Sequence, residues 1–208
     1  MKHLTPCQNL NEALDSLDNG GRFYNIFTTA QDGVISKAEL SKVCGVINDR
    51  QQMILFLELT TSDLKKSEKE IIHSKLESGL QEIYEKYRSQ RLSPSEVESQ
   101  GKMASNIVVS GTPKLIDSRS RFNGFITIPV AAGSVTTVVM VPIIDQYDVY
   151  ELRDEESSVH CLIAHQKSKS QKLPSKKITI GGVLKELSED KSDDLPKQRF
   201  IEIAYYLD

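Results

Sequence analysis

The segment Ile178-Thr179-Ile180-Gly181-Gly182-Val183-Leu184 decides the fold class of the second half of this chain. β-Branched residues dominate it, which favours a strand over a helix. A glycine inside a strand is typical of a tight bend or a close backbone approach. The glycine pair is not a phosphate-binding loop, because no helix start follows it and no Lys-Ser or Lys-Thr pair stands behind it. We therefore expect a bent strand.

Other β-rich runs lie on both sides of this segment. After Ser105 the apolar pattern changes to a period of two, and short runs are separated by clusters of Gly, Pro, Asp and Ser. No helix long enough to cross over a parallel sheet intervenes, so the pattern predicts a small antiparallel sandwich or barrel. The expected strands are 106–110, 122–130, 135–141, 147–152, 159–165, 177–187 and 199–207.

The segment Ile178–Leu184 and the later run Phe200-Ile201-Glu202-Ile203-Ala204 resemble strands of an OB-type barrel. The resemblance implies a binder of single-stranded nucleic acid or a phosphate ligand. The matching sequence feature is a basic run with no intervening acid, which could contact phosphates by releasing counterions. Its simpler interpretation is a solvated loop, and no aromatic residue is interleaved to stack on bases. The run contains Lys167, Lys169, Lys172, Lys176 and Lys177.

The first hundred residues are helical in pattern. Asn9 and Asn19-Gly20-Gly21 bound one expected helix, and a second short helix should cover Phe23 to Phe27. The apolar run Met53–Leu59 predicts a buried helix, although a strand fits so short a run too. Apolar spacings of three and four predict one long amphipathic helix from Lys65 to Gln90. We expect an α+β protein with a helical domain at 1–103 and a β domain at 104–208.

One loop in the helical half resembles an EF-hand. In the segment 28–39, TTAQDGVISKAE, Gly33, Ile35 and Glu39 stand at the sixth, eighth and twelfth places of the motif. The resemblance implies calcium ligands at Thr28, Asp32, the Val34 carbonyl, Ser36 and Glu39, while Ala30 offers no side-chain oxygen. Calcium wants about six to eight oxygens, and no second loop of this kind follows.

The same residues also predict a purely structural corner. Ser36 and Glu39 form a capping box, in which each side chain satisfies a backbone N–H at the start of a helix. Gly33 would then make the turn and Ile35 would pack. Of the two interpretations we favour the corner, and we retain Asp32, Ser36 and Glu39 as the candidate calcium site.

Composition limits the protein class. The 208 residues are 38% hydrophobic and 26% charged, which is typical of a globular chain, and the net charge of −3 indicates no polyanionic partner through the global field. Cys7, Cys44 and Cys161 are widely spaced, so reduced thiols in the cytoplasm are expected. The N-terminus has no apolar stretch typical of a signal peptide.

An uncharged stretch runs from Phe122 to Ile144. It is long enough to cross a bilayer as a helix. Pro129, Pro142 and several glycines interrupt it, and β-branched residues dominate, so two strands joined by a turn near Ala131 are the better interpretation. We expect no membrane span.

Enzymatic chemistry has no clear motif in this sequence. Cys161 and His165 share one face of an expected strand, where they could act as nucleophile and base, but a buried cysteine beside a histidine is commoner. We expect a non-catalytic binding or regulatory protein that acts through protein–protein contacts. The alternatives are an OB-type nucleic-acid or phosphate binder using the lysine run, and a weak calcium-responsive regulator.

Overall fold

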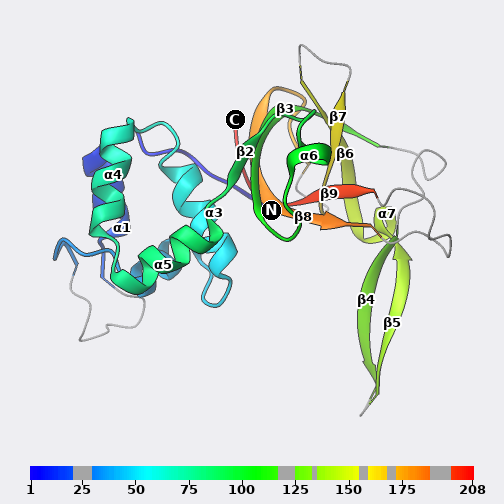
Figure 1. Cartoon of the computed structure of the whole chain (residues 1–208), viewed down its shortest axis with the longest axis horizontal. Helices are drawn as coiled ribbons and strands as arrows, with labels where there is room; N and C mark the ends of the chain where they lie inside the picture. Colours follow the sequence, from blue (N-terminus) through cyan, green and yellow to red (C-terminus); the bar gives the residue numbers. More distant parts are fainter. Residues whose placement is uncertain (21–29, 117–124, 133–134, 155–158, 168–171, 188–197) are drawn as a thin grey trace. The chain divides into compact units, whose positions relative to one another are not determined.

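A computed structural model describes residues 1–20, 30–116, 125–132, 135–154, 159–167, 172–187 and 198–208 (Figure 1). Two compact units make up the chain. One unit comprises Gln90–Ala204 together with Met1 and Asp208. The other comprises Lys2–Ser89 together with Tyr205–Leu207. The first unit contains most of the strands and the second most of the helices, which confirms the α+β class.

Five strands close into a barrel. These are β3 (Asn106–Leu115), β6 (Tyr147–Arg153), β7 (His160–Gln166), β8 (Ile178–Glu186) and β9 (Arg199–Leu207). Around the ring the order is β3, β6, β7, β9 and β8, and β8 pairs with β3 to close it. The pairs β3·β6, β6·β7 and β3·β8 are antiparallel, whereas β7 and β9 run parallel. The barrel expectation is confirmed, and within the ring the β7·β9 pair departs from a purely antiparallel arrangement.

Two glycines permit the close strand contacts of the ring. A Cβ at Gly182 would lie 2.3 Å from the Glu202 carbonyl oxygen and 2.7 Å from Cγ2 of Ile201. A Cβ at Gly111 would lie 2.6 Å from the Arg153 carbonyl oxygen. Real Cβ atoms do not approach other atoms this closely, so each site accepts only glycine without a backbone shift. The second glycine of the pair Gly181-Gly182 therefore lies where β8 contacts β9 and the barrel closes.

Apolar residues fill both sides of the β6, β7 and β9 sheet. On one face Leu152, Ile163 and Ile201 are fully buried. On the other face an apolar cluster covers the strands, so the sheet is not open to solvent there. The buried members of this cluster are Ile143, Val149, Leu162, Ala164, Leu187 and Phe200.

Short elements extend the edge of β3. The strand β2 (Gln90–Leu92) runs parallel to residues Ile107–Val109 of β3. The Ser93 hydroxyl and amide both donate to Glu96 Oε2, at 2.9 and 2.8 Å, and the short helix α6 (Val97–Gln100) follows. Arg199 fixes α6 by donating to the Glu98 carbonyl at 2.9 Å.

The uncharged stretch forms a hairpin. β4 (Phe125–Ala132) pairs antiparallel with β5 (Val135–Pro142), and the short helix α7 (Ile143–Gln146) leads on to β6. This confirms two strands in the stretch, while residues 122–124 and the turn at 133–134 lie outside the described residues. Among the described helices, none has the length and apolar character to cross a bilayer.

The helical unit contains five helices in its described residues: α1 (Leu10–Leu17), α2 (Lys37–Cys44), α3 (Arg50–Thr60), α4 (Lys66–Lys75) and α5 (Ser78–Tyr87). Met53, Ile54 and Leu55 of α3 are fully buried, as expected of an apolar helix at the centre of a core. The short strand β1 (Lys2–His3) pairs with Tyr205 and Tyr206 at the end of β9. The helix expected at Phe23–Phe27 lies outside the described residues.

The single long helix expected from Lys65 to Gln90 is wrong. Leu76 is extended, with φ −64° and ψ 136°, and separates α4 from α5. Ile35 donates its N–H to the Lys75 carbonyl at 2.7 Å and accepts from the Glu77 N–H at 3.0 Å. These two hydrogen bonds replace helical ones at this point. The apolar periodicity of the sequence does not indicate the interruption, because it reports only the spacing of apolar residues.

Replacing Gly182 with alanine tests the closure of the barrel. We expect Gly182→Ala to lower the free energy of unfolding by about 1–3 kcal/mol, because the new methyl group overpacks against β9. Urea unfolding followed by circular dichroism measures the change. Gly79→Ala is the matched control: nothing lies within 4 Å of that Cβ, so this change should be neutral or stabilising. Equal stability of the Gly182→Ala variant and the original chain would contradict the closure argument.

Candidate ligand sites

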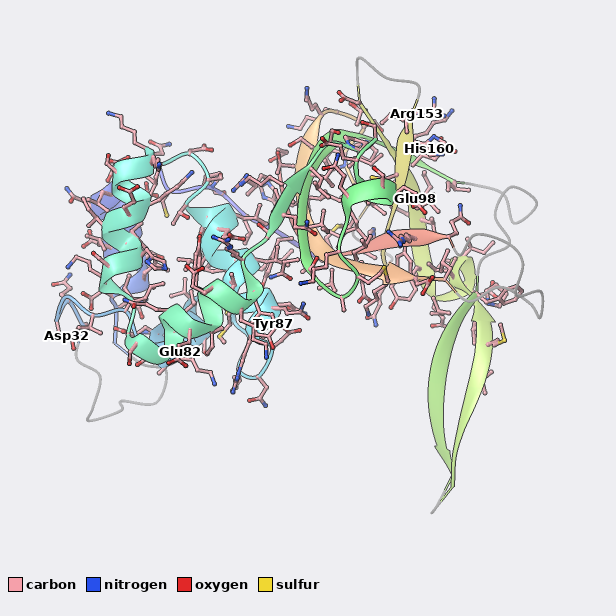
Figure 2. All side chains as sticks on the ribbon, viewed as in Figure 1. Asp32, Glu82, Tyr87, Glu98, Arg153 and His160 are labelled. Carbon is pink, nitrogen blue, oxygen red and sulfur yellow. The ribbon has the colours of Figure 1, made fainter. Side chains whose placement is uncertain are left out.

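The EF-hand-like loop uses its carboxylates as hydrogen-bond acceptors. Glu39 is 1% exposed. Its Oε2 accepts from the Ser36 amide and hydroxyl, both at 2.8 Å, and its Oε1 accepts from the Gly20 amide at 2.6 Å. The capping box of Ser36 and Glu39 is therefore present. Asp32 is exposed and its Oδ1 accepts from the Val34 amide at 2.9 Å. Figure 2 shows Asp32 at the outer edge of the loop.

Asp18 is a loop residue that sequence reasoning missed. It is buried at the end of α1 and accepts from the Gly33 amide at 2.8 Å and the Asp32 amide at 3.2 Å. On the opposite side of the loop, Lys42 donates to the carbonyls of Asn19 and Gly20, each at 3.0 Å. An acidic residue just beyond a helix is common, so the position of Asp18 in the sequence does not indicate its contact with the loop.

No group of three or more His, Cys, Asp or Glu side chains in the described residues has a geometry that would hold a metal ion. Thr28 lies outside those residues. A calcium ion at Asp32, Ser36 and Glu39 would have to compete with the backbone donors that now occupy Glu39. The calcium site stays a prediction.

The four described lysines of the basic run have different surroundings. Lys172 pairs with Asp148 Oδ1 at 2.7 Å, and Lys176 pairs with Asp208 at 2.9 Å. Lys167 and Lys177 line two different cavities, and Lys169 lies outside the described residues. Lys172 and Lys176 are thus already neutralised by a carboxylate.

One of these cavities is a notch in the edge of β3, between β2 and the end of β6. It occupies about 370 Å³. On the same edge of β3, β2 pairs with residues 107–109 and β6 pairs with residues 112–115. None of the described strands therefore lies beside residues 110 and 111 on that edge. The lining residues are Arg91, Leu92, Ser93, Pro94, Val108, Val109, Ser110, Asp154 and Lys177.

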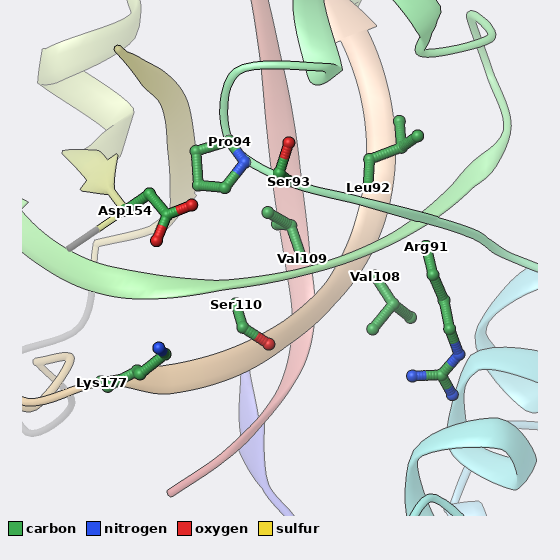
Figure 3. Close-up of a pocket in the computed structure, with 9 residues that line it drawn as sticks. All are labelled: Arg91, Leu92, Ser93, Pro94, Val108, Val109, Ser110, Asp154 and Lys177. Carbon is green, nitrogen blue, oxygen red and sulfur yellow. The ribbon is translucent and has the colours of Figure 1, made fainter. Parts of the chain in front are cut away.

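The notch combines both signs of charge with hydroxyl groups and apolar walls. Figure 3 shows Arg91 on one side, Lys177 on another and Asp154 beside Pro94. The Ser110 hydroxyl shares a hydrogen bond of 2.7 Å with Thr179, which orients it at the exposed surface of the strand pair. Lys177 was part of the predicted anion site, whereas Arg91 and Asp154 were not predicted to join it. Only the pairing of β2 with β3 brings Arg91 to the notch.

A buried polar cluster lies at one end of β6 and β7. Asp148 and His165 are direct partners across the two strands, and both are buried. The rings of Tyr150 and His165 stack with centroids 5.8 Å apart. The Tyr150 hydroxyl accepts from the Leu173 amide at 3.3 Å. The strand pattern predicts the position of His165 but not its pairing with Asp148, since cross-strand register depends on the whole sheet.

His165 and Cys161 are not poised as an acid–base pair. Burial raises the pKa of the Cys161 thiol to about 12, so the nucleophilic thiolate is absent at neutral pH. Burial also lowers the pKa of His165, and its Nδ1 lies 2.8 Å from the Gln166 carbonyl. Since a carbonyl only accepts, Nδ1 carries the proton and Nε2 is the bare nitrogen. On Figure 2 the exposed His160 lies near Arg153, its partner in the neighbouring strand.

No protein-family model matches this chain, and no curated protein matches it either.

Acid should destabilise the barrel through His165. The imidazole has a pKa below 6.5 in the folded protein and about 6.5 in the unfolded chain. The unfolded chain therefore binds the proton more readily, so stability is lost as the pH falls through about 6.5. Asp148 opposes this shift, while Lys172 and the N-terminal ammonium add to it.

The measurement is the free energy of unfolding between pH 7.5 and about pH 5, compared with His165→Gln. We expect the original chain to lose more stability over this range than the variant. His160→Gln, at an exposed histidine of the same strand, should keep the original pH dependence. Identical slopes for the original chain and His165→Gln would contradict the assignment.

Proposed function

We propose that this chain is a non-catalytic binding protein that acts through contacts with a protein partner, and that the notch receives an extended segment of that partner. One observation carries the proposal. The fold brings Arg91 and Lys177, which lie far apart in the sequence, to one notch with exposed hydroxyls and apolar walls. Proteins commonly recognise extended peptides along strand edges, where backbone groups and alternate side chains both contribute.

The charges of the notch favour a peptide over a polyanion. Asp154 would repel a run of phosphates, whereas a peptide offers carboxylates for Arg91 and Lys177 and N–H donors for Asp154. Leu92, Val108 and Val109 supply apolar surface for a side chain of the partner. The partner segment should therefore be acidic with interspersed apolar residues. The cytoplasmic location stays part of this proposal, supported by three free cysteines.

Peptide binding at the notch is testable by fluorescence anisotropy. A labelled library of extended peptides that alternate Asp or Glu with Leu or Val supplies the probes. We expect Arg91→Ala and Lys177→Ala each to weaken binding about two- to fivefold, because partly exposed ion pairs contribute about 0.5–1 kcal/mol. Lys176→Ala makes the same charge change at the adjacent residue, outside the notch lining, and should leave the affinity unchanged. If all three variants bind equally, the notch is not the peptide site.

A second function is favoured by the connectivity of the barrel. In chain order the strands close as first, second, third, fifth and fourth, and the third and fifth are parallel. This supports assignment to the Greek-key OB type, whose members bind oligonucleotides and oligosaccharides. An apolar cluster covers the outer side of β6 and β7, so that face is not open to a nucleic acid. Phosphate contacts would therefore come from Lys167 and Lys177.

Single-stranded DNA separates the two functions. If Lys167 and Lys177 contact phosphates, affinity for a thymidine oligonucleotide should fall steeply with salt, and alanine at both positions should reduce the slope by about 1.4, or 0.7 per phosphate contact. Filter binding between low and physiological salt measures the slope. Lys66→Ala, at an exposed lysine of α4, is the control. Absent or salt-independent binding rules out the nucleic-acid function and leaves the peptide function standing.

A further inference from the structure

One face of the strip formed by β2, β3 and β8 gathers the cations and hydroxyls of the notch. Arg91 on β2 is the register partner of Val108 on β3, which lies two residues before Ser110. Ser110 is in turn the register partner of Thr179 on β8, and Lys177 lies two residues before Thr179. Because side chains two residues apart point to the same face of a strand, all of these residues share one face.

The shared face is the outer, solvent-exposed one. Ile178 and Ile180 belong to the opposite face of β8 and are buried, whereas Arg91, Ser110 and Lys177 are exposed. Figure 3 shows Ser110 between Arg91 and Lys177. Since a strand rises about 3.3 Å per residue, the row of each cation lies about 7 Å along the sheet from Ser110, on opposite sides of it. Long, flexible Arg and Lys side chains can span that distance.

The groups on this face are hydrogen-bond donors. Ser110 and Thr179 share a hydrogen bond of 2.7 Å, which uses one of their two hydroxyl hydrogens, so the other can donate to a ligand. The flanking guanidinium and ammonium groups only donate. Arg153, the partner of Thr112 further along the same face, already pairs with Glu151 at 2.6 Å. Donors of this kind beside one another select an acceptor that carries negative charge.

The two strands that bound the notch limit how far a partner chain can run along β3. β2 runs parallel to β3 and its last pair joins Leu92 to Val109, whereas β6 runs antiparallel and its last pair joins Arg153 to Thr112. Both strands therefore run toward the gap from opposite sides and end there. The gap covers two residues of β3, or about 7 Å. A partner strand cannot continue along this edge in either direction, so a chain that enters the gap ends in it.

We propose that the notch binds the free C-terminus of the partner protein, with the terminal carboxylate at the hydroxyl pair of Ser110 and Thr179. Arg91 and Lys177 pair with this carboxylate from the two sides. The inference rests on the proposed peptide function and specifies which part of the partner enters the notch. A chain end brings its carboxylate with no residue after it, so it fits a gap that β2 and β6 close at both ends. An internal Asp or Glu would require the partner backbone to pass over one of those strands.

Fluorescence anisotropy of the full chain with matched peptide pairs tests this inference. Each peptide of the Asp/Glu and Leu/Val library carries its label at the N-terminus and is made with either a free C-terminal carboxylate or a carboxamide. We expect the free acids to bind at least about fivefold more tightly, because the amides lose the charge-assisted contacts. An amide with one additional Glu at its N-terminal end restores the net charge and should bind no better than the parent amide. If it binds as tightly as the free acid, net charge alone explains the affinity and the inference is overturned.

A double variant places the carboxylate. When Arg91→Ala and Lys177→Ala are combined, the free acid should bind no more than about twofold more tightly than the amide. Lys176→Ala, at the adjacent residue outside the notch lining, should keep the original ratio. Free acid and amide that bind the original chain equally, and are both weakened by Arg91→Ala, would overturn the C-terminal inference and leave the peptide function standing. If neither form binds the original chain, both proposals fail.

Discussion

The close contacts of β8 with β9 and of β3 with β6 are the constraint on which the barrel unit depends. At Gly182 and Gly111 one strand lies so near the backbone of the next that only a hydrogen atom fits in place of a side chain. A five-stranded ring is narrow, so its strands must bend sharply to close, and glycine permits the bend without steric conflict. With the ring closed, Leu152, Ile163 and Ile201 are removed from water together.

Closure also creates the two cavities. β3 is longer than its neighbours, so it pairs with β8 and β2 along its first half and with β6 along its second. The gap between β2 and β6 becomes the notch. At the other end, the register of β6 and β7 sets the buried Asp148 opposite the buried His165. Both sites follow from strand lengths and register more than from any local motif.

In the helical unit, buried carboxylates accept hydrogen bonds from the backbone amides of the loop. Asp18 and Glu39 accept from the amides of Gly33, Gly20 and Ser36. Ile35 ties the loop to Lys75 and Glu77 through backbone hydrogen bonds. Buried amides need acceptors, and these carboxylates supply them within the chain. The loop is therefore held in shape by its own hydrogen bonds, with the capping box of Ser36 and Glu39 at its centre.

The sequence by itself determined the elements that depend on neighbours in the chain. The alternation of β-branched residues located the strands of the barrel to within a few residues, and β9 coincides with its expected range, Arg199–Leu207. The capping box at Ser36 was likewise visible, because its partner Glu39 is three residues further along the chain. Only the tertiary structure decided the break at Leu76, the parallel pairing of β7 with β9, and the meeting of Arg91 with Lys177. Each of these depends on a backbone or cavity contact between segments distant in the sequence, and periodicity carries no information about which segments meet.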